Sequence, residues 1–368
     1  MKTIAVVMNI PSPYRSDLFN YIQSEFKNYN VYIIYQSENE DNRKWKIETK
    51  LKNEIFLESK TFKIKKKLDY KYIHISRNLE TKLKSISPDL VVVAEYNIDS
   101  FRTVRWCIKN NIRYTSWTDG TTNSETNINV IQKILRKYII SNANSYIASS
   151  SRSMENQVSY GANAEKITIS PLTVNTKKYL YKKENKIINE KIKLLFVGRL
   201  VEIKGIDILI DIMSKLNRDN YELNIVGDGY LLTDLEKKID NYGLKNNIFF
   251  RGYLEGEELL QYYRMSNLFI LPSLSESFGL VILEAMCNSL GIICSEYVDS
   301  HPDLIKKGKN GIIFNPLDEV DCLIKLRYIL DNEAILEKMG DESFQIAESF
   351  SIQNSAELFK KGIDMGLY

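Results

Sequence analysis

Residues 193–206 read K-L-L-F-V-G-R-L-V-E-I-K-G-I, an apolar run followed by a turn with two cations and the start of an apolar-periodic segment. The run at 193–197 is typical of a buried strand, and the spacing from Ile206 onward predicts a helix. In open α/β sheets, ligands bind beyond the carboxyl ends of the strands. Arg199 offers a planar fork and Lys204 a mobile point charge, so this loop is suited to holding a diphosphate. Taken alone, the loop is better explained by two solvated surface cations.

A second strand-loop-helix pattern lies at residues 268–284. The run at 268–272 is strand-like, and helical periodicity begins after Gly279. Glu276 closes the loop, and Glu284 follows eight positions later. Free N–H groups at a helix start favour an anion, and carboxylates accept hydrogen bonds from hydroxyls. The two patterns together predict a site for a nucleotide sugar, whereas this one alone is also compatible with a charged helix cap and an exposed helical Glu.

These motifs resemble those of the retaining family-4 glycosyltransferases of GT-B fold, whose C-terminal half carries a G-R-L loop with a K-G pair and an E-x7-E motif. The matching positions are Gly198-Arg199-Leu200, Lys204-Gly205, Glu276 and Glu284, with Val226-Gly227-Asp228-Gly229, Phe250-Arg251-Gly252-Tyr253 and Pro272-Ser273 in the family's usual order. The resemblance covers residues 190–315 strongly and is thinner in the N-terminal half. It implies an α/β chain of GT-B fold, with two Rossmann-like domains facing across a cleft.

The resemblance also implies roles for individual residues. It assigns donor binding to Gly198, Arg199, Lys204, Gly252, Tyr253, Glu276, Ser277, Phe278, Gly279, Leu280 and Glu284. Arg199 and Lys204 would grip the diphosphate, together with backbone N–H groups from 277–279. Glu284 would bind the ribose, Glu276 would orient the transferred sugar, and the 252–253 pair would lie near the base.

The pair Gly227 and Gly229 also invites comparison with a dinucleotide-binding loop. The G-x-G-x-x-G pattern fails because its last position is Leu232. We therefore do not expect NAD binding, and we predict a tight turn after a strand at 223–226.

The N-terminal half alternates strands and helices, which predicts a parallel sheet covered on both faces. We expect strands at 3–8, 31–35, 90–94, 113–117 and 145–148, and helices at 17–26 and 100–110. Residues 36–70 are polar and irregular, with room for an antiparallel excursion.

Length and pattern predict two domains. The first, 1–175, is expected to be an acceptor-binding Rossmann-like domain, and the second, 176–345, a nucleotide-sugar-binding one. A charged stretch without a core pattern places the linker at 175–191. By resemblance, residues 346–368 would carry a final helix, from 352 to 365, that crosses back to the first domain.

Several residues of the first half are candidates for the acceptor side. After the first strand comes P-S-P-Y-R at 11–15, which resembles a subset of the family. Because prolines limit how near the backbone can approach a phosphate, Ser12, Tyr14 and Arg15 are expected to line the cleft. Arg15 could meet a donor or acceptor phosphate, or form a structural ion pair.

Four further polar residues complete the acceptor-side candidates. Asp119 follows another strand where many relatives have a histidine near the reacting centre, so we assign it to the catalytic group with Glu276, Arg199 and Lys204. Glu125 lies slightly later, and the pair Glu95 and Tyr96 follows the strand at 90–94, with a structural role as the alternative for that pair.

The two histidines are not expected to act as acid or base. His74 is expected at the surface or in a helix. His301 lies in D-S-H-P-D at 299–303, where the family commonly has a G-G-x-P-E run. Because of this departure, the resemblance does not determine which residues of this segment contact the transferred sugar.

Composition agrees with a soluble globular enzyme: 44% of the residues are hydrophobic and 26% are charged. No apolar run is long enough to cross a bilayer, and the polar, proline-bearing segment at 9–15 argues against a signal peptide, so we expect a cytoplasmic site. The four cysteines form no C-x-x-C pair and are expected to be free and mostly buried. Without a D-x-D triplet, no metal and no other cofactor is expected.

Charge is unevenly distributed along the chain. Residues 1–175 carry 26 Lys and Arg against 17 Asp and Glu, a net of +9, which leaves −6 for the remainder. The densest basic cluster comprises Lys60, Lys63, Lys65, Lys66, Lys67 and Lys71 with Phe62, Ile64 and Leu68 between them, and Lys133, Arg136 and Lys137 follow beside Ile131, Ile134 and Leu135. Such a surface can adhere to anionic lipid on the inner face of the cell membrane, or can simply be a solvated lysine-rich face. Nucleic acid is not an expected partner, because no recognition module accompanies the lysines.

These observations predict a glycosyltransferase that needs no metal, and the resemblance implies that it retains the anomeric configuration. It would move a sugar from a nucleotide-diphosphate sugar, with UDP the commoner carrier, to a hydroxyl of a glycan or lipid-linked glycan in bacterial surface polysaccharide synthesis. The alternatives are a nucleotide-sugar 2-epimerase or other GT-B enzyme without a sugar acceptor, and a silent nucleotide-binding partner. The intact set of Arg199, Lys204, Glu276 and Glu284 argues against the silent partner.

Overall fold

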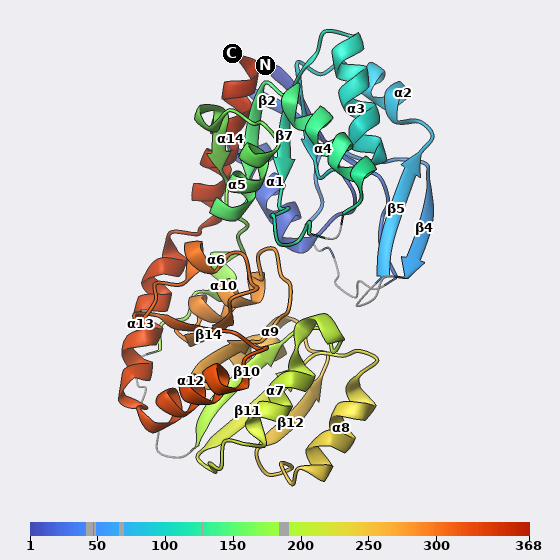
Figure 1. The fold of residues 1–368 in the computed structure, drawn as a ribbon. Coiled ribbons are helices and arrows are strands. Elements are labelled where there is room, and N and C mark those ends of the chain that lie inside the picture. The colour runs from blue at the N-terminus through green and yellow to red at the C-terminus, as the bar shows by residue number, and fades with distance from the viewer. Residues whose placement is uncertain (42–46, 48, 66–69, 127, 184–190) are drawn as a thin grey trace. The chain divides into compact units, whose positions relative to one another are not determined.

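The computed structural model describes residues 1–41, 47, 49–65, 70–126, 128–183 and 191–368. The chain divides into two compact units, the first formed by 1–175 with 351–368 and the second by 176–350. Each unit is a parallel sheet with helices packed against it (Figure 1), so the predicted α/β class with two Rossmann-like halves is confirmed.

The sheet of the first unit has seven strands in the order β3-β2-β1-β6-β7-β8-β9, and every neighbouring pair is parallel. The strands are β1 Lys2–Met8, β2 Tyr29–Tyr35, β3 Glu54–Phe56, β6 Leu90–Ala94, β7 Arg113–Thr118, β8 Ser145–Ala148 and β9 Ile167–Ile169. The central strand β6 is buried along its whole length, as expected for a parallel strand covered on both faces. The five strands predicted in this half are confirmed.

Six α-helices and one short 3₁₀ turn belong to this unit in the described ranges: α1 Pro13–Glu25, α2 Leu79–Ile86, α3 Ile98–Lys109, α4 Val130–Ser141, α5 Ser151–Ser159, η1 Ala164–Lys166 and α14 Ile352–Leu367. The final helix, α14, packs on the first unit: Phe359 lies between Phe19 and Trp117, with ring centroids 6.2 and 5.0 Å away. Gly362 allows close approach, because a Cβ there would lie 2.4 Å from Ile147.

Helix α1 begins earlier than predicted. Pro13 occupies its first turn, where a missing N–H costs nothing and the fixed φ suits the helix. Tyr14 and Arg15 are therefore helical residues, and the expectation of a loop extending through residue 15 was wrong.

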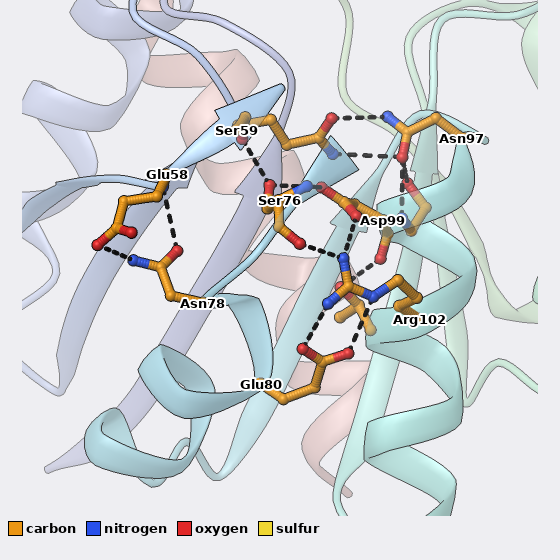
Figure 2. A network of polar contacts seen from close by, with 11 residues as sticks. Glu58, Ser59, Ser76, Asn78, Glu80, Asn97, Asp99 and Arg102 are labelled. Atoms are coloured by element: carbon orange, nitrogen blue, oxygen red, sulfur yellow. Dashed lines mark hydrogen bonds and ion pairs between the residues drawn. The ribbon is translucent and has the colours of Figure 1, made fainter. Parts of the chain in front are cut away.

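An antiparallel hairpin, β4 Ser59–Lys65 and β5 Tyr70–Ser76, stands apart from the main sheet. A buried polar network anchors its base (Figure 2). Asp99 on α3 accepts hydrogen bonds from the Ser76 backbone and hydroxyl, and Arg102 bridges Asp99, at 2.8 Å, to Glu80, at 2.6 Å. The hairpin is thereby tied to two helices through charge-assisted bonds.

The position expected for His74 was wrong. It lies in strand β5 and is 3% exposed, with hydrogen-bonding contacts to Thr61, at 2.8 Å, and Glu40, at 3.2 Å. These partners, one on the neighbouring strand and one in an irregular segment, satisfy both ring nitrogens and permit burial.

The sheet of the second unit has six parallel strands in the order β12-β11-β10-β13-β14-β15. They are β10 Ile192–Val197, β11 Tyr221–Val226, β12 Ile248–Gly252, β13 Leu268–Leu271, β14 Gly291–Ser295 and β15 Gly311–Phe314. The helical segments are α6 Thr176–Tyr179, η2 Glu202–Lys204, α7 Ile206–Met213, α8 Leu232–Asn241, α9 Gly256–Met265, α10 Leu280–Cys287, α11 His301–Leu304, α12 Glu319–Asp331 and α13 Ala334–Glu348.

The region expected as a linker, 175–191, is partly packed chain. Helix α6 opens the second unit, and the N–H of Tyr181 donates to the carbonyl of Cys287 at 2.8 Å. Residues 184–190 lie outside the described residues.

Both sheets reverse their strand order beside their first strand. In the first unit the chain runs outward from β1 through β2 to β3 and then continues on the other side with β6; in the second, β10 and β13 are the corresponding neighbours. Loops that leave the carboxyl ends of two such strands diverge and open a crevice, which is where open α/β sheets bind ligands. Each unit therefore has one position at which a site is expected.

The four cysteines are free and buried, as predicted. Among the described residues, no helix is both long and apolar enough to cross a membrane.

Candidate functional site

In the second unit, the strand order reverses between the two patterns singled out in the sequence. The loop after β10 carries Lys204, and the loop after β13 ends at Glu276; their side chains form an ion pair. Both side chains are largely shielded, at 16% and 23% exposure. Residues 72 positions apart in the chain are thus brought together where a ligand is expected.

A close backbone approach holds these two loops in place. Gly205 has φ +65°, and a Cβ there would lie 2.2 Å from the carbonyl oxygen of Pro272. The N–H of Leu274 donates to the carbonyl of Ile203 at 2.8 Å, which joins the loops directly. Only glycine fits beside Pro272, so the K-G pair of the sequence motif has a steric cause.

The loop after β11 is joined to the same site. Gly227 has φ +146°, and a Cβ there would lie 1.8 Å from the carbonyl oxygen of Gly198. The N–H of Leu200 donates to the carbonyl of Asp228 at 2.9 Å. The predicted tight turn is confirmed, and it supports the loop in which half-buried Arg199 lies.

Helix α10 begins directly behind Glu276. Gly279 is its N-cap, with φ +73°, and none of the described side chains caps the helix start. The carbonyl of Phe278 accepts a hydrogen bond from the Ser300 hydroxyl, and Ser277 and Leu280 flank the cap on either side. Uncapped N–H groups at a helix start carry partial positive charge, so this position suits an anion.

The D-S-H-P-D run, which departs from the family pattern, supports the backbone of Glu276. The N–H of Asp299 donates to the carbonyl of Glu276 at 2.8 Å, and the N–H of Glu276 donates to the carbonyl of Tyr297 at 3.1 Å. Sequence reasoning did not assign this supporting role, because it depends on the parallel bridge between Glu276 and Val298.

Glu284 lies in α10 and is half-buried. Its carboxylate accepts a hydrogen bond from the buried hydroxyl of Tyr263 at 2.7 Å. Burial raises the pKa of Glu284, and hydrogen bonds from Tyr263 and Tyr179 oppose that rise. Gly252, with φ +71°, ends β12, and the next residue, Tyr253, is 45% exposed.

In the first unit, a hollow of about 280 Å³ lies where the strand order reverses. It is lined by Asn9, Ile10, Ser12, Tyr14, Arg15, Glu40, Glu95 and Asp119. Asn9 follows β1, Glu95 follows β6 and Asp119 follows β7, so three neighbouring strands deliver polar side chains to one place. The hollow thus brings together five residues that were predicted from the sequence: Ser12, Tyr14, Arg15, Glu95 and Asp119.

Arg15 is the centre of this group. It is 5% exposed, and its guanidinium pairs with Glu95 at 3.2 Å and with Asp119 at 2.5 Å. The guanidinium carbon also lies 4.8 Å from the ring centre of Trp117. Of the roles considered for Arg15, the structure supports an internal ion pair, because both ends of the fork are occupied by carboxylates.

Glu95 is held in a strained conformation. Its φ is +64°, which non-glycine residues rarely adopt, and the amide of Asn9 donates to its carboxylate. Burial raises its pKa, while the Arg15 guanidinium opposes that rise. Such strain at the edge of a binding crevice is typical of functional residues.

Two acceptor-side candidates do not join the group. Glu125 is 9% exposed and pairs with Arg136 at 2.7 Å, and the Tyr96 hydroxyl lies 3.0 Å from that of Ser116. Neither lines the hollow, so the structure does not bring these two candidates together with the others. Both side chains are instead directed into packed parts of the unit.

Three residues that line the hollow were missed, the apolar Ile10 and the polar Asn9 and Glu40. Asn9 follows a predicted strand directly, so the rule that pointed to Glu95 would have found it. Glu40 belongs to the irregular segment, which carries no pattern from which its position could be predicted.

Comparisons with known proteins show which family and which solved structures this chain is similar to. Residues 178–345, which span the strands and loops of the second unit, match the family described as glycosyl transferases group 1. Over 99% of its length the chain superposes on the whole of Anabaena Alr3699/HepE, solved in complex with UDP, with a TM-score of 0.77 at 12% identity. The fold is therefore GT-B, and the second unit is similar to the glycosyl transferases group 1 domain.

Curated relatives match over parts of the chain. The sulfoquinovosyl transferase SQD2 of Arabidopsis thaliana is 35% identical over 164 residues, 44% of this chain and 31% of the relative. A Campylobacter jejuni alpha-1,4-N-acetyl-D-galactosaminyltransferase that acts on a diNAcBac-PP-undecaprenol glycan is 28% identical over 171 residues, 46% of each chain. The match thus spans less than half the length of either relative.

Proposed function

We propose that this protein is a retaining glycosyltransferase that moves a sugar from a nucleotide-diphosphate sugar, with UDP as the expected carrier, to a hydroxyl of a glycan or lipid-linked glycan. The observation that carries the proposal is the Lys204–Glu276 pair, in the crevice where the strand order of the second unit reverses. It combines a cation for a diphosphate with a carboxylate for sugar hydroxyls.

The donor site is proposed to form around this pair. Lys204 and Arg199 would hold the diphosphate together with the uncapped start of α10. Glu276 would accept hydrogen bonds from the transferred sugar, and Glu284 from the ribose hydroxyls. Tyr263 and Tyr179 support the ribose assignment, because their hydrogen bonds orient the carboxylate, whose remaining lone pairs can accept from ribose hydroxyls.

The reaction is proposed to need no covalent intermediate on the protein. The bond between the anomeric carbon and the phosphate oxygen breaks, and a bond to the acceptor oxygen forms on the same face of the sugar. The acceptor proton passes to the departing phosphate oxygen. Lys204, Arg199 and the helix start would stabilise the negative charge that develops on the leaving group, so no metal is assigned a role.

The acceptor is proposed to bind at the hollow of the first unit. Glu40, Glu95 and Asp119 bring three carboxylates, whereas Arg15, among the lining residues, brings one cation that is already paired. A phosphate would be repelled by this lining, while hydroxyls can donate to it. We therefore assign the hollow to the sugar portion of the acceptor, with Asp119 close to the reacting hydroxyl.

Contact with an anionic membrane surface, on the cytoplasmic side, is part of the proposal. On β4, Phe62 and Ile64 are 51% and 42% exposed, with exposed lysines between and beside them. On α4, Ile131 and Ile134 are 75% and 63% exposed beside exposed Lys133. Apolar side chains flanked by lysines suit anionic lipid.

Part of the basic cluster does not contribute to this surface. Arg136 is buried and pairs with Glu125, so it is not part of the proposed membrane-contact surface. Lys66, Lys67 and Leu68 lie outside the described residues. Cosedimentation with anionic vesicles, compared with zwitterionic ones, tests the proposed contact; equal binding to both would refute it.

The function is tested with purified protein, UDP- and GDP-sugars, and lipid-linked acceptors. Transfer that requires the acceptor supports the proposal, an isomerised donor would indicate the epimerase, and binding without turnover would indicate a silent partner. Glu276→Ala should lower transfer by about 10²-fold or more while leaving nucleotide binding nearly intact. Glu258→Ala, an exposed carboxylate of the same unit, is the matched control. Equal loss of transfer and nucleotide binding in Glu276→Ala would reject its role.

A further inference from the structure

Helix α12 is apolar on two opposite faces. Its inner face is buried through Cys322, Leu326, Ile329 and Leu330. Its outer face presents Val320, Ile324 and Tyr328, which are 66%, 63% and 52% exposed, and Leu317, 64% exposed, lies in the turn that precedes the helix. A surface helix ordinarily has one apolar face and a polar face opposite to it. The outer face of α12 is apolar although no described part of the unit covers it.

The exposed residues form one continuous stripe. Val320, Ile324 and Tyr328 are spaced four positions apart, which places them above one another along the helix, and Leu317 precedes the N-cap Asp318. We refer to Leu317, Val320, Ile324 and Tyr328 as the α12 stripe. Scattered exposed apolar residues need no explanation, but an aligned set of this kind marks an interaction surface.

The charges around the α12 stripe do not suit an anionic lipid surface. Lys215 pairs with Glu319 at 2.6 Å, and Arg218 pairs with Asp331 at 3.0 Å. The basic residues beside the stripe are thus compensated within the unit.

The charged residues on one side of the α12 stripe are complementary in charge to the same residues of a second copy. Asp321 and Lys325, 2.5 Å apart, border the stripe on one side, and Arg327 borders it on the other. When two copies of a helix face each other in antiparallel orientation, equal flanks meet and run in opposite directions. Asp321 of each copy then lies opposite Lys325 of the other, twice by symmetry. In a parallel pair, opposite flanks meet and bring Lys325 towards Arg327, which is repulsive.

We propose that the α12 stripe is the centre of a two-fold, antiparallel contact between two copies of this chain. The contact pairs Val320 with Ile324 of the other copy, and Leu317 with the region of Tyr328. Four side chains cover less than the roughly 800 Å² per partner of a standard interface. The dimer is therefore weak and depends on protein concentration.

Sedimentation velocity over a concentration series tests the association. The weight-average mass of the wild type should rise from 42.8 kDa towards twice that value as concentration increases. Ile324→Lys should keep the protein monomeric, because it places two buried cations near the symmetry axis. Ile108→Lys, at a 44% exposed position on α3, is the matched control and should dimerise like the wild type.

Cysteine cross-linking tests the orientation. All four native cysteines are buried, so exposed thiols arise only from the substitutions. The double variant Val320→Cys, Ile324→Cys should form a covalent dimer under mild oxidation. Leu317→Cys should not, because the two Leu317 positions are about 15 Å apart along antiparallel helices but adjacent in a parallel pair.

Three results would overturn the proposal. They are a wild type that stays monomeric at the highest concentration, a dimer that survives Ile324→Lys, and efficient cross-linking through Leu317→Cys. None of these readouts depends on sugar transfer, so a failure of the proposed enzymatic function is distinguishable from a failure of this proposal.

Discussion

Replacing Arg15 by methionine removes the one cation among the residues that line the hollow, while keeping much of its packing volume. The side chain is 6% exposed and lies between Glu95 and Asp119. Without it, two shielded carboxylates face each other uncompensated, and the contact with Trp117 is lost. Breaking a buried pair by removing one partner costs about 3–5 kcal/mol of the free energy of unfolding. At about 2–4 °C per kcal/mol, the melting temperature should fall by about 6–20 °C.

The pH dependence of this loss has a definite sign. Burial raises the pKa of Glu95, and the Arg15 guanidinium opposes that rise, so the pKa should rise further in the variant. A carboxyl whose pKa is higher in the folded than in the unfolded protein binds more protons when folded. The free energy of unfolding then falls as pH rises between the two pKa values. The deficit should therefore be largest near neutral pH and smaller near about pH 5.

Thermal and urea unfolding of wild type and Arg15→Met at both pH values measure this effect. Arg152→Met, which removes an exposed ion pair with Glu155 at 3.3 Å, is the matched control and should change the melting temperature little at either pH. The reasoning is refuted if Arg15→Met unfolds like the wild type at neutral pH, or if its deficit grows on acidification.

Three further outcomes follow from local geometry. Gly205→Ala should destabilise the second unit by about 2–4 kcal/mol and reduce transfer, because its Cβ would lie 2.2 Å from the Pro272 carbonyl oxygen; urea unfolding checks this, and an unchanged midpoint would contradict the steric argument. Tyr263→Phe should weaken nucleotide binding by about tenfold, because Glu284 loses its orienting hydrogen bond; calorimetry with the nucleotide measures it, and unaltered affinity would remove Glu284 from the site. Burial raises the pKa of the Cys107 thiol to about 12, so a thiol reagent at mildly alkaline pH should modify it only after denaturation; rapid native labelling would contradict its burial.

The sequence predicted the regular elements because buried parallel strands are apolar on both faces. The strand at Leu90–Ala94 was predicted with its observed bounds, and so was the one at Ser145–Ala148. Helix starts were less certain. Helix α1 begins four residues earlier than the predicted Asp17, at Pro13, because a proline that breaks a helix interior is favourable in its first turn.

Polar residues were harder to place than apolar ones. The burial of His74 depends on Thr61 and Glu40, and that of Arg15 on Glu95 and Asp119. A charged or polar side chain is buried only where partners from other segments satisfy it, and no local pattern records those partners. The same reason explains why the sequence did not show that Glu125 and Tyr96 lie apart from the other acceptor-side candidates.

By itself, the sequence determined the class of fold, the strands that carry loops with chemistry, and the residue types offered at their carboxyl ends, because each of these depends on local periodicity and composition. Only the tertiary structure decided which of those residues meet. Lys204 reaches Glu276 because β10 and β13 are neighbours and Gly205 allows their loops to touch. Strand order is a property of the whole sheet, so the pairing of side chains across it depends on long-range packing rather than on sequence spacing.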